Sequence, residues 1–445
     1  MRTYEHIKTG LLIGLVGLSL ILTWKLWTFQ PDIALLDNTS RYIPSEVMSE
    51  ERKLADVIQP QFMVVHQQEK YAMISPKDGR FDQLYEKLLA STLEESEQGT
   101  RIARKRLDGD GIEVMFPTEI PAEIFLSLFQ LSREEHSLPT GTINSIFLYG
   151  DKKDEQVYMQ LLSKKEEQVV EMKTNLSLKE LTDSFIAKFD EYIEVVKVES
   201  ESNENPPGNI YLPVNPVAAE KLSFTVSPIS GQFFRQTLFT DPASVKYYRQ
   251  TDGEESYTDG NRIINIRNNG LFMEYNNPVY SDKDRSSKHI IQGSYEFING
   301  HGGWTNTYFL TDWVSTDRRD VAEYRLRVNK YPVISFKGLD QMLLRISRSG
   351  NQTESYFRPL FNIDNQPIDA KETVELRSGL DVIERLKQHE TFELSQLQKV
   401  IIGYEMTMPN RSFVTVEPNW FVLYDNRWQK ITFTDEEGGR SNGLE

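Results

Sequence analysis

The N-terminal segment from Ile7 to Phe29 constrains this chain most, because it is long, apolar and almost free of charge. Residues 9–24 contain no Asp, Glu, Lys or Arg and consist mostly of Leu, Ile, Val and Gly. A helix rises about 1.5 Å per residue, so this segment would reach roughly 35 Å and cross a hydrocarbon core of about 30 Å. The sequence therefore predicts a single transmembrane helix over residues 7–29.

The residues on either side of the apolar segment predict its orientation. Three aromatic residues are expected at one membrane–water interface: Trp24, Trp27 and Phe29. Arg2 and Lys8 lie before or at the start of the segment, and positive flanking charge favours the cytoplasmic side. We therefore expect residues 1–6 to form a cytoplasmic tail and residues 30–445 to lie outside the cell membrane.

A cleaved signal peptide is the alternative interpretation, because it also has a charged start followed by an apolar run. Signal peptidase needs small residues at the cleavage site. The chain has Trp-Thr-Phe-Gln-Pro at residues 27–31, where most side chains are bulky. The bulky residues that follow the apolar segment therefore favour an uncleaved anchor.

Three glycines give the predicted anchor a second feature. Gly10 and Gly14 form a GxxxG spacing, and Gly17 lies about one turn further along the same side. Small residues on one helix side allow another membrane helix to approach closely, which predicts a membrane partner contact at these glycines. Glycine is also common in membrane helices for no specific reason, so the spacing alone leaves both interpretations open.

Composition limits the partners of the extracytoplasmic region. The chain has 66 acidic and 50 basic residues, with a formal net charge of −16. Such a surface does not suit nucleic acid, and we expect protein partners instead. The chain has no cysteine, which excludes disulfides, thiolate nucleophiles and cysteine metal sites and suits an exported Gram-positive protein.

Strand-like segments alternate irregularly with amphipathic helices, which predicts the α+β class. Residues 199–208 combine charged residues with two prolines and a glycine, which is typical of a linker. The predicted units are a stalk at 30–44, an N-terminal α+β domain at 45–198, the linker at 199–208, a middle α+β domain at 209–302 and a C-terminal α+β domain at 303–445.

Particular helices and turns support this division. Apolar stripes predict helices near residues 81–93, 231–239, 287–299 and 380–388. Ser177 and Glu180 form a capping box that opens a further predicted helix, whose stripe continues to Val196. Asn268-Asn269-Gly270 predicts a hairpin turn. The order of strands, one helix and three strands recurs in both units after residue 208.

No motif in the chain identifies catalytic, cofactor or metal chemistry. The six histidines lack the spacing of a helical metal pair. His301-Gly-Gly-Trp304 resembles an esterase oxyanion loop, but no Gly-x-Ser-x-Gly accompanies it, so a glycine-rich junction is favoured. Trp420 and Trp428 are interpreted as sheet packing rather than a sugar platform. We therefore predict no catalytic residue, no cofactor and no metal site.

Seven short motifs, in this order, resemble the YycH family: residues 23–31, Ile210–Pro213, Leu238–Pro242, Tyr257–Gly260, Met273–Pro278, Gly403–Met406 and Glu417–Trp420. The resemblance covers nearly the whole chain. It implies an auxiliary regulator of the WalK-WalR two-component system, which controls cell-wall metabolism in low-GC Gram-positive bacteria. It also implies a three-domain ectodomain whose last two domains share a topology.

The resemblance further implies two membrane partners, a WalK-like sensor histidine kinase and a smaller YycI-like protein. The main hypothesis is therefore a non-enzymatic, membrane-anchored regulator that contacts the kinase. Two alternatives remain open from the sequence: a wall-associated hydrolase tethered to the membrane, and an extracytoplasmic ligand-binding module.

Overall fold

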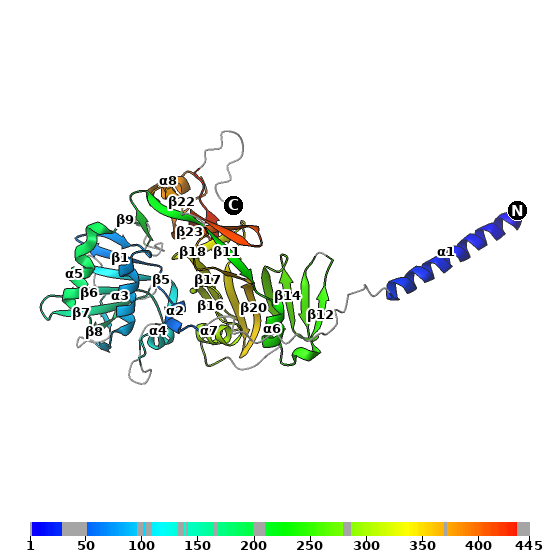
Figure 1. Ribbon diagram of the computed structural model, residues 1–445, viewed down its shortest axis with the longest axis horizontal. Helices are drawn as coiled ribbons and strands as arrows, with labels where there is room; N and C mark the ends of the chain where they lie inside the picture. The colour runs from blue at the N-terminus through cyan, green and yellow to red at the C-terminus, as the bar shows by residue number, and fades with distance from the viewer. Residues whose placement is uncertain are drawn as a thin grey trace.

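The protein is a mixed helix and strand fold in which two β-sheets meet, as expected for the α+β class (Figure 1). The computed structural model describes residues 2–28, 51–95, 101–103, 109–131, 138, 141–163, 168–198, 210–251, 253–278, 286–368 and 372–433. The predicted stalk at 30–44 and the predicted linker at 199–208 lie outside these residues.

Helix α1 (Arg2–Thr28) contains almost all of the predicted membrane segment and lies apart from both sheets (Figure 1). Its described apolar side chains are exposed, for example Leu20 at 66% and Trp24 at 71%. Within the described part of the chain, no helix is long and apolar enough to cross a membrane. The anchor at residues 7–29 therefore stays a prediction from the sequence.

The first sheet, called here the N-terminal sheet, is antiparallel at every described pairing and has the strand order β10-β9-β2-β1-β5-β6-β7-β8-β3, with β4 also paired to β8. Its strands are β1 (Phe62–Gln67), β2 (Lys70–Ile74), β3 (Leu93–Glu95), β4 (Arg101–Ala103), β5 (Gly111–Pro121), β6 (Thr142–Asp151), β7 (Gln156–Leu162), β8 (Gln168–Thr174), β9 (Ile193–Val198) and β10 (Ile210–Pro213).

Helices cover one face of the N-terminal sheet. Successive residues of a strand point to opposite faces, so the residues of β1 divide between the helix-covered face and the other face. On β1, Met63 and Val65 belong to the same core cluster as Phe81 and Leu84, whereas Val64 belongs to a separate cluster. The helices of this region are α2 (Leu54–Val57), α3 (Gly79–Ala90), α4 (Ala122–Leu128) and α5 (Leu178–Ser184).

One predicted helix is much shorter than expected. The apolar stripe beginning at Leu178 predicts a helix to Val196, but α5 ends at Ser184, a 3-10 helix covers Ile186–Glu191, and β9 begins at Ile193. The segment is rich in β-branched residues, which favour a pleated strand. Pairing of β9 with both β2 and β10 then overrides the helical stripe.

The second sheet, called here the C-terminal sheet, has the strand order β12-β13-β14-β15-β20-β19-β17-β18-β23-β24-β11-β21, with β16 on β17, β22 on β11 and β25 on β24. Its strands are β11 (Val217–Pro228), β12 (Lys246–Arg249), β13 (Glu255–Thr258), β14 (Ile263–Arg267), β15 (Phe272–Asn276), β16 (Tyr308–Ser315), β17 (Asp320–Val328), β18 (Tyr331–Phe336), β19 (Leu343–Ser349), β20 (Gln352–Pro359), β21 (Phe361–Ile363), β22 (Glu372–Leu376), β23 (Leu397–Asn410), β24 (Phe413–Tyr424) and β25 (Arg427–Lys430).

Four amphipathic helices lie within three residues of their predicted ends: α3, α6 (Gly231–Leu238), α7 (Ile290–Gly300) and α8 (Gly379–Lys387). The predicted hairpin also joins β14 to β15, where Asn268, Asn269 and Gly270 all have positive φ, of 52°, 56° and 87°. These local features depend on nearby residues, which is why the sequence predicts them.

Strand pairing crosses two of the predicted domain boundaries. β15, within the predicted middle domain, pairs with β20, within the predicted C-terminal domain, so one sheet runs through both. β10 follows the predicted linker, yet it pairs with β9 in the N-terminal sheet. A strand with an unpaired edge pairs with whichever strand lies beside it, which explains the pairing of β15 with β20 and of β10 with β9. The three-domain division stays a prediction.

β10 connects the two sheets because its side chains alternate between them. Ile210 and Leu212 are buried in a cluster with α8, β23 and β24, while Tyr211 is buried in a cluster with β1 and β9. Each such apolar side chain stabilises the junction by roughly 1.5–3 kcal/mol. β10 thus contributes side chains to the hydrophobic clusters on both sides of the junction.

We expect the two fragments, residues 1–203 and 204–445, to stay together after the chain is cut between β9 and β10. A protease site inserted between residues 203 and 204 should yield two fragments that elute as one particle in size-exclusion chromatography, because β10 remains paired with β9. A denaturing gel confirms cleavage. Two separate native peaks would contradict this role for β10.

Replacing Gly379 with alanine should destabilise the protein. A Cβ at this first residue of α8 would lie 2.7 Å from the Leu212 Cβ and 3.1 Å from the Pro213 Cδ of β10. Such overpacking costs about 1–3 kcal/mol, measurable by chemical denaturation. Gly141→Ala is the matched control, because nothing lies within 4 Å of its Cβ position. Equal stability of both variants would contradict the close α8–β10 contact.

Candidate functional site

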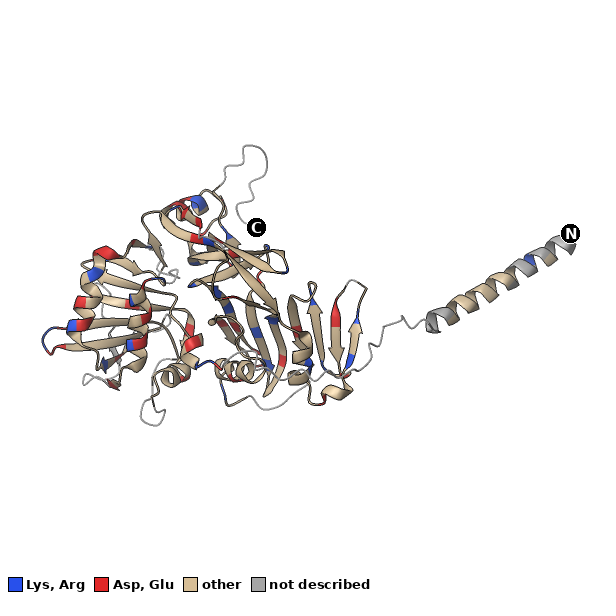
Figure 2. Ribbon diagram, viewed as in Figure 1, with Lys and Arg blue, Asp and Glu red and all other residues tan. Residues whose placement is uncertain are grey.

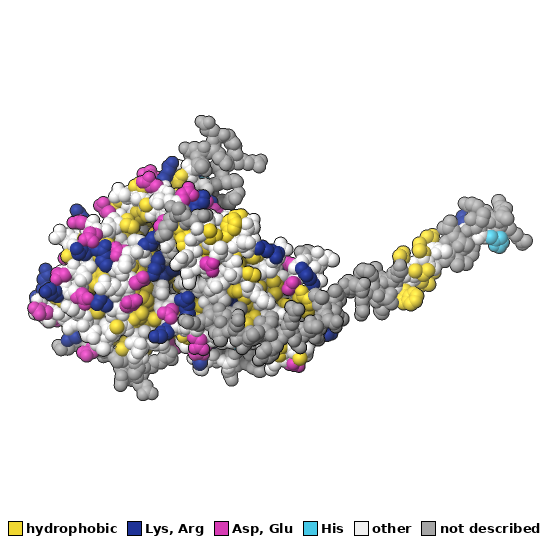
Figure 3. Space-filling model, viewed as in Figure 1, with side chains coloured by type: hydrophobic (Ala, Val, Ile, Leu, Met, Phe, Trp, Pro, Cys, Tyr) yellow, Lys and Arg dark blue, Asp and Glu magenta, His cyan; other side chains and the backbone are white. Residues whose placement is uncertain are grey.

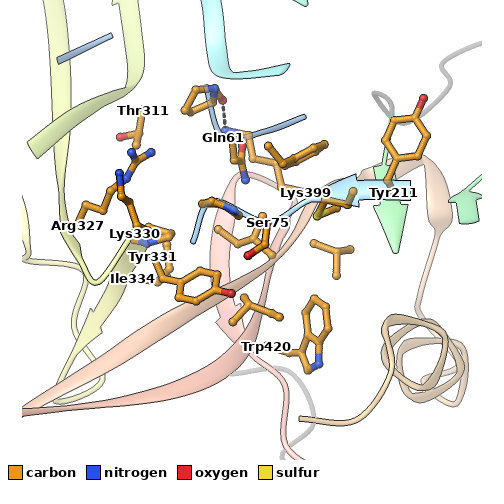
Figure 4. Close-up of a pocket in the computed structure, with 18 of the residues that line it drawn as sticks. Gln61, Ser75, Tyr211, Thr311, Arg327, Lys330, Tyr331, Ile334, Lys399 and Trp420 are labelled. Carbon is orange, nitrogen blue, oxygen red and sulfur yellow. Dashed lines mark hydrogen bonds between the residues drawn. The ribbon is translucent and has the colours of Figure 1, made fainter. Parts of the chain in front are cut away.

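A cavity of about 90 Å³ lies where the two sheets meet, and we call it the junction cavity (Figure 4). The N-terminal side contributes residues from the start of β1, from β2, β9 and β10, and Pro117 of β5. The C-terminal side contributes residues from β11, β16, β17, β18, β23, β24 and β25. Its walls therefore depend on how the two sheets pack.

Most of the lining is apolar. These side chains are Phe62, Met73, Pro76, Pro117, Ile193, Tyr211, Pro213, Val217, Phe309, Tyr331, Pro332, Ile334, Val400, Ile401, Ile402, Trp420 and Trp428. Pockets that bind small molecules are typically apolar with a few placed polar groups. Trp420 also packs in the sheet and donates its Nε1–H to the Arg377 carbonyl at 2.9 Å.

The charged lining residues are all cations. They are Arg325, Arg327, Lys330 and Lys399, and the residues lining the cavity include no Asp or Glu. Figure 2 shows Lys and Arg segments on the central strands of the C-terminal sheet, which include β17 with Arg325 and Arg327. This excess of positive charge contrasts with the acidic composition of the whole chain.

Arg325 and Lys330 each have a carboxylate partner among the described residues. Arg325 Nη1 and Nη2 donate to the two Asp340 carboxylate oxygens at 2.5 and 3.0 Å. Lys330 Nζ lies 2.7 Å from the Asp82 carboxylate, which belongs to α3 of the N-terminal region. In Figure 4, Lys330 and Arg327 lie on the same side of the cavity.

Arg327 is held differently. Its Nη1 donates to Gln59 Oε1 at 2.5 Å and its Nη2 to the Pro60 carbonyl at 3.3 Å, and the guanidinium lies 4.1 Å from the Phe309 ring centre. No carboxylate of the described residues lies within ion-pair distance. Burial lowers the pKa of Arg327 to about 10, so the side chain remains a cation at neutral pH.

Hydrogen bonds to backbone carbonyls also cross the junction. Trp313 Nε1 of β16 donates to the Glu119 carbonyl at 2.6 Å, and Lys399 Nζ of β23 donates to the Pro117 carbonyl at 2.6 Å. Both carbonyls belong to β5. These bonds hold β5, a central strand of the N-terminal sheet, against the C-terminal sheet.

A buried polar cluster lies on the face of the N-terminal sheet opposite its helices. Glu113 is fully buried and accepts from Tyr211 at 2.8 Å and from Ser145 at 3.0 Å, while His66 Nε2 lies 3.4 Å away. Tyr211 belongs to β10, so this network ties β10 to the centre of the sheet. The four residues are at most 2% exposed, which favours a structural role.

The glycines predicted to contact a membrane partner all lie on α1. No described atom lies within 4 Å of the Cβ position of Gly14 or Gly17. The surroundings of Gly10 fall outside the described part of the chain. The structure brings these glycines together with no other described element, and their role stays a prediction.

The other motifs singled out in the sequence lie in turns and sheets. Gly302 and Gly303 have positive φ and follow α7, where the Gly303 amide donates to the Ile298 carbonyl at 2.9 Å, so His301–Trp304 ends a helix. At Gly403 of β23, a Cβ would lie 2.8 Å from Ile334 Cγ1. Among the described residues, no group of three or more His, Asp or Glu side chains is placed to hold a metal ion.

Sequence reasoning missed the junction cavity. Its lining comes from segments spread between residues 61 and 428, which no local pattern connects. One signal was present: Arg325 and Arg327 alternate with apolar residues on a strand of an acidic chain. Alternation places both guanidinium groups on the same face, here the one that meets the N-terminal sheet.

Comparison with known proteins gives consistent matches over most of the chain. The N-terminal domain of the YycH protein family matches residues 5–190, and its C-terminal domain matches residues 208–438. A relative from Bacillus subtilis (strain 168), the "Two-component system WalR/WalK regulatory protein YycH", is 22% identical over 96% of each chain. The crystal structure of YycH from Bacillus subtilis covers 86% of this chain and 98% of its own, with a TM-score of 0.69 at 16% identity.

We expect the hydrogen bond from the Trp313 indole to the Glu119 carbonyl to stabilise the protein more than the exposed ion pair of Lys330 does. Trp313→Phe leaves the Glu119 carbonyl without this donor and should cost about 1–3 kcal/mol of unfolding free energy. Lys330→Met removes a pair whose side chains are 40% and 51% exposed, which should cost under about 1 kcal/mol. Chemical denaturation measures both, and the reverse ranking would contradict this account of the junction.

Proposed function

Because this chain belongs to the YycH family, we propose that it is a non-enzymatic, membrane-anchored regulator of a WalK-like sensor histidine kinase. The observation that carries the proposal is the extent of the similarity, since the Bacillus subtilis relative named as a WalR/WalK regulatory protein aligns over 96% of both chains. Regulation of a two-component system is thus the function we assign.

The proposed anchor is the segment at residues 7–29. It forms most of helix α1, and eight large apolar side chains of this helix are more than half exposed: Leu12, Leu15, Val16, Leu18, Leu20, Ile21, Leu22 and Trp24 (Figure 3). A helix that is apolar on all sides needs an apolar environment, and a bilayer supplies one. Residues 1–6 would then lie in the cytoplasm and residues 30–445 outside.

This topology limits how the protein reaches the kinase. A cytoplasmic tail of about six residues extends at most roughly 20 Å and makes few contacts with a catalytic domain. Regulation would therefore pass through membrane helices or through the extracytoplasmic regions. A partner shifts the balance between two kinase states only by the difference in its affinity for them.

The glycine side of α1 is the proposed contact for the kinase and for a YycI-like membrane partner. Gly10, Gly14 and Gly17 lie on one side of the helix. Helix association in lipid depends on close packing and hydrogen bonding, which small residues permit. The exposed Cβ positions of Gly14 and Gly17 leave room for a neighbouring helix.

Changing Gly10, Gly14 and Gly17 together to leucine should abolish co-purification with the kinase and the YycI-like partner. The segment stays apolar, so membrane insertion survives, while the added bulk blocks close helix packing. In a deletion strain complemented with this variant, transcription from WalR-controlled promoters should match that of the uncomplemented strain. Immunoblotting of membrane fractions checks the protein level.

The matched control changes Leu12, Leu15 and Val16 to phenylalanine, because these residues lie on the opposite side of the helix. It adds bulk without touching the glycine side and should co-purify and regulate normally. Normal regulation by the glycine variant would place the contact in residues 30–445. A deletion strain with unchanged WalR-controlled transcription would contradict the regulatory function itself.

A further inference from the structure

The side chain of Arg327 brings a positive charge to the wall of the junction cavity without a direct ion pair to any described carboxylate. Arg325 and Lys330 are paired with Asp340 and Asp82, which lie outside the lining. Arg327 has no such partner among the described residues, and its Nε has no hydrogen-bond acceptor. Asp82 attracts Arg327 only from beyond ion-pair distance, since its carboxylate contacts Lys330. A buried charge without a directly paired counter-charge lowers stability, so its presence needs another explanation.

Arg358 on β20, which β19 separates from β17, shows how this fold buries an arginine for structural purposes. It is fully buried, and its Nε, Nη1 and Nη2 all donate to neutral oxygens, including Tyr356 Oη at 2.8 Å and Thr305 Oγ1 at 2.9 Å. Arg358 does not line the junction cavity. Arg327 differs from Arg358 because its side chain forms part of the cavity wall and its Nε has no acceptor. Arg348 and Arg385 also have an Nε without an acceptor, but neither lines the junction cavity, so the position in the cavity wall is what distinguishes Arg327.

The remaining walls around Arg327 are suited to an apolar group. Tyr331, Ile334 and Trp420 lie along one side of the cavity in Figure 4, and Ile401 and Trp428 also line it. We propose that the junction cavity binds a small amphipathic monoanion, a carboxylate whose charged end pairs with Arg327 and whose apolar body packs on these side chains. A guanidinium and a carboxylate form two parallel hydrogen bonds, which gives both affinity and orientation.

The size of the cavity limits the ligand. A second cavity of about 80 Å³ shares Gln61, Tyr211, Lys399 and Ile401 with the junction cavity of about 90 Å³. The second cavity is also lined by Glu119, so the carboxylate of the ligand is expected at the Arg327 end and its apolar body toward the second cavity. Together the two cavities are of the order of a cavity that holds one benzene ring, about 150 Å³. The ligand is therefore a free carboxylate with one ring or a short acyl chain, and a two-chain lipid is too large.

Such a ligand would contact both sheets at once. Arg327 and Ile401 belong to the C-terminal sheet, whereas Phe62 and Tyr211 belong to the N-terminal sheet. Binding would therefore favour the arrangement in which the sheets are packed as described. A ligand that prefers one arrangement shifts the population toward it.

Four probes test the proposal with the full chain in lipid nanodiscs, with empty nanodiscs as the blank. Phenylacetate, 2-phenylethanol and phenethylammonium have similar size and shape but negative, neutral and positive charge, and inorganic phosphate is an anion with no apolar body. Dissociation constants from ligand-observed NMR should show phenylacetate at least tenfold tighter than each of the others. Equal affinity for the three phenyl compounds, or tighter binding of phosphate, would overturn the proposal.

Variants assign the binding to the cavity. Arg327→Gln keeps a hydrogen-bond donor but removes the charge, and should weaken phenylacetate binding at least tenfold. Arg345→Gln is the control, because Arg345 is exposed on β19, pairs with Glu323 at 2.6 Å and does not line the cavity; it should change binding less than twofold. Thermal denaturation checks that each variant is folded.

A second variant keeps the proposal testable if Arg327→Gln does not fold. Ile401→Trp fills the space shared by the two cavities and leaves Arg327 in place. It should also reduce phenylacetate affinity at least tenfold. A folded Arg327→Gln or Ile401→Trp variant with the affinity of the unmodified protein would show that the ligand binds elsewhere and would overturn the proposal.

Discussion

The packing of β10 between two sheets is the contact on which the rest of the structure depends. Its backbone pairs with β9, while Ile210 and Leu212 are buried against α8, β23 and β24. Tyr211 points the other way and donates to the buried Glu113. One short strand therefore contributes to two hydrophobic clusters and one polar network, because strand residues alternate between faces.

The junction between the two sheets also buries positive charge. Packing the two sheets takes Arg325 and Arg327 of β17 out of water, although an acidic chain offers many carboxylates that stay at the surface. Asp340 compensates Arg325, whereas Arg327 relies on neutral oxygens and an aromatic ring. Natural proteins retain such unfavourable arrangements mainly where a site requires them.

In the proposed topology, two routes connect residues 30–445 with a kinase: packing of the membrane helix and packing at the junction between the two sheets. Helix packing in lipid depends on small residues and close contact. The junction between the sheets depends on apolar burial and a few hydrogen bonds, among them that of Trp313 to the Glu119 carbonyl. A regulator that uses both can respond to its membrane neighbours and to the space between its own sheets.

The sequence by itself determined the features that arise from neighbouring residues. Amphipathic stripes predicted α3, α6, α7 and α8, the Asn268–Gly270 turn predicted a hairpin, and ordered motifs predicted the YycH family. Only the tertiary structure decided that the segment after Tyr192 is a strand, that one sheet continues across residue 302, and that Arg327 lines a cavity with Tyr211. These outcomes depend on partners far away in the chain, and the pairing of strand edges and burial of side chains outweigh local preference there.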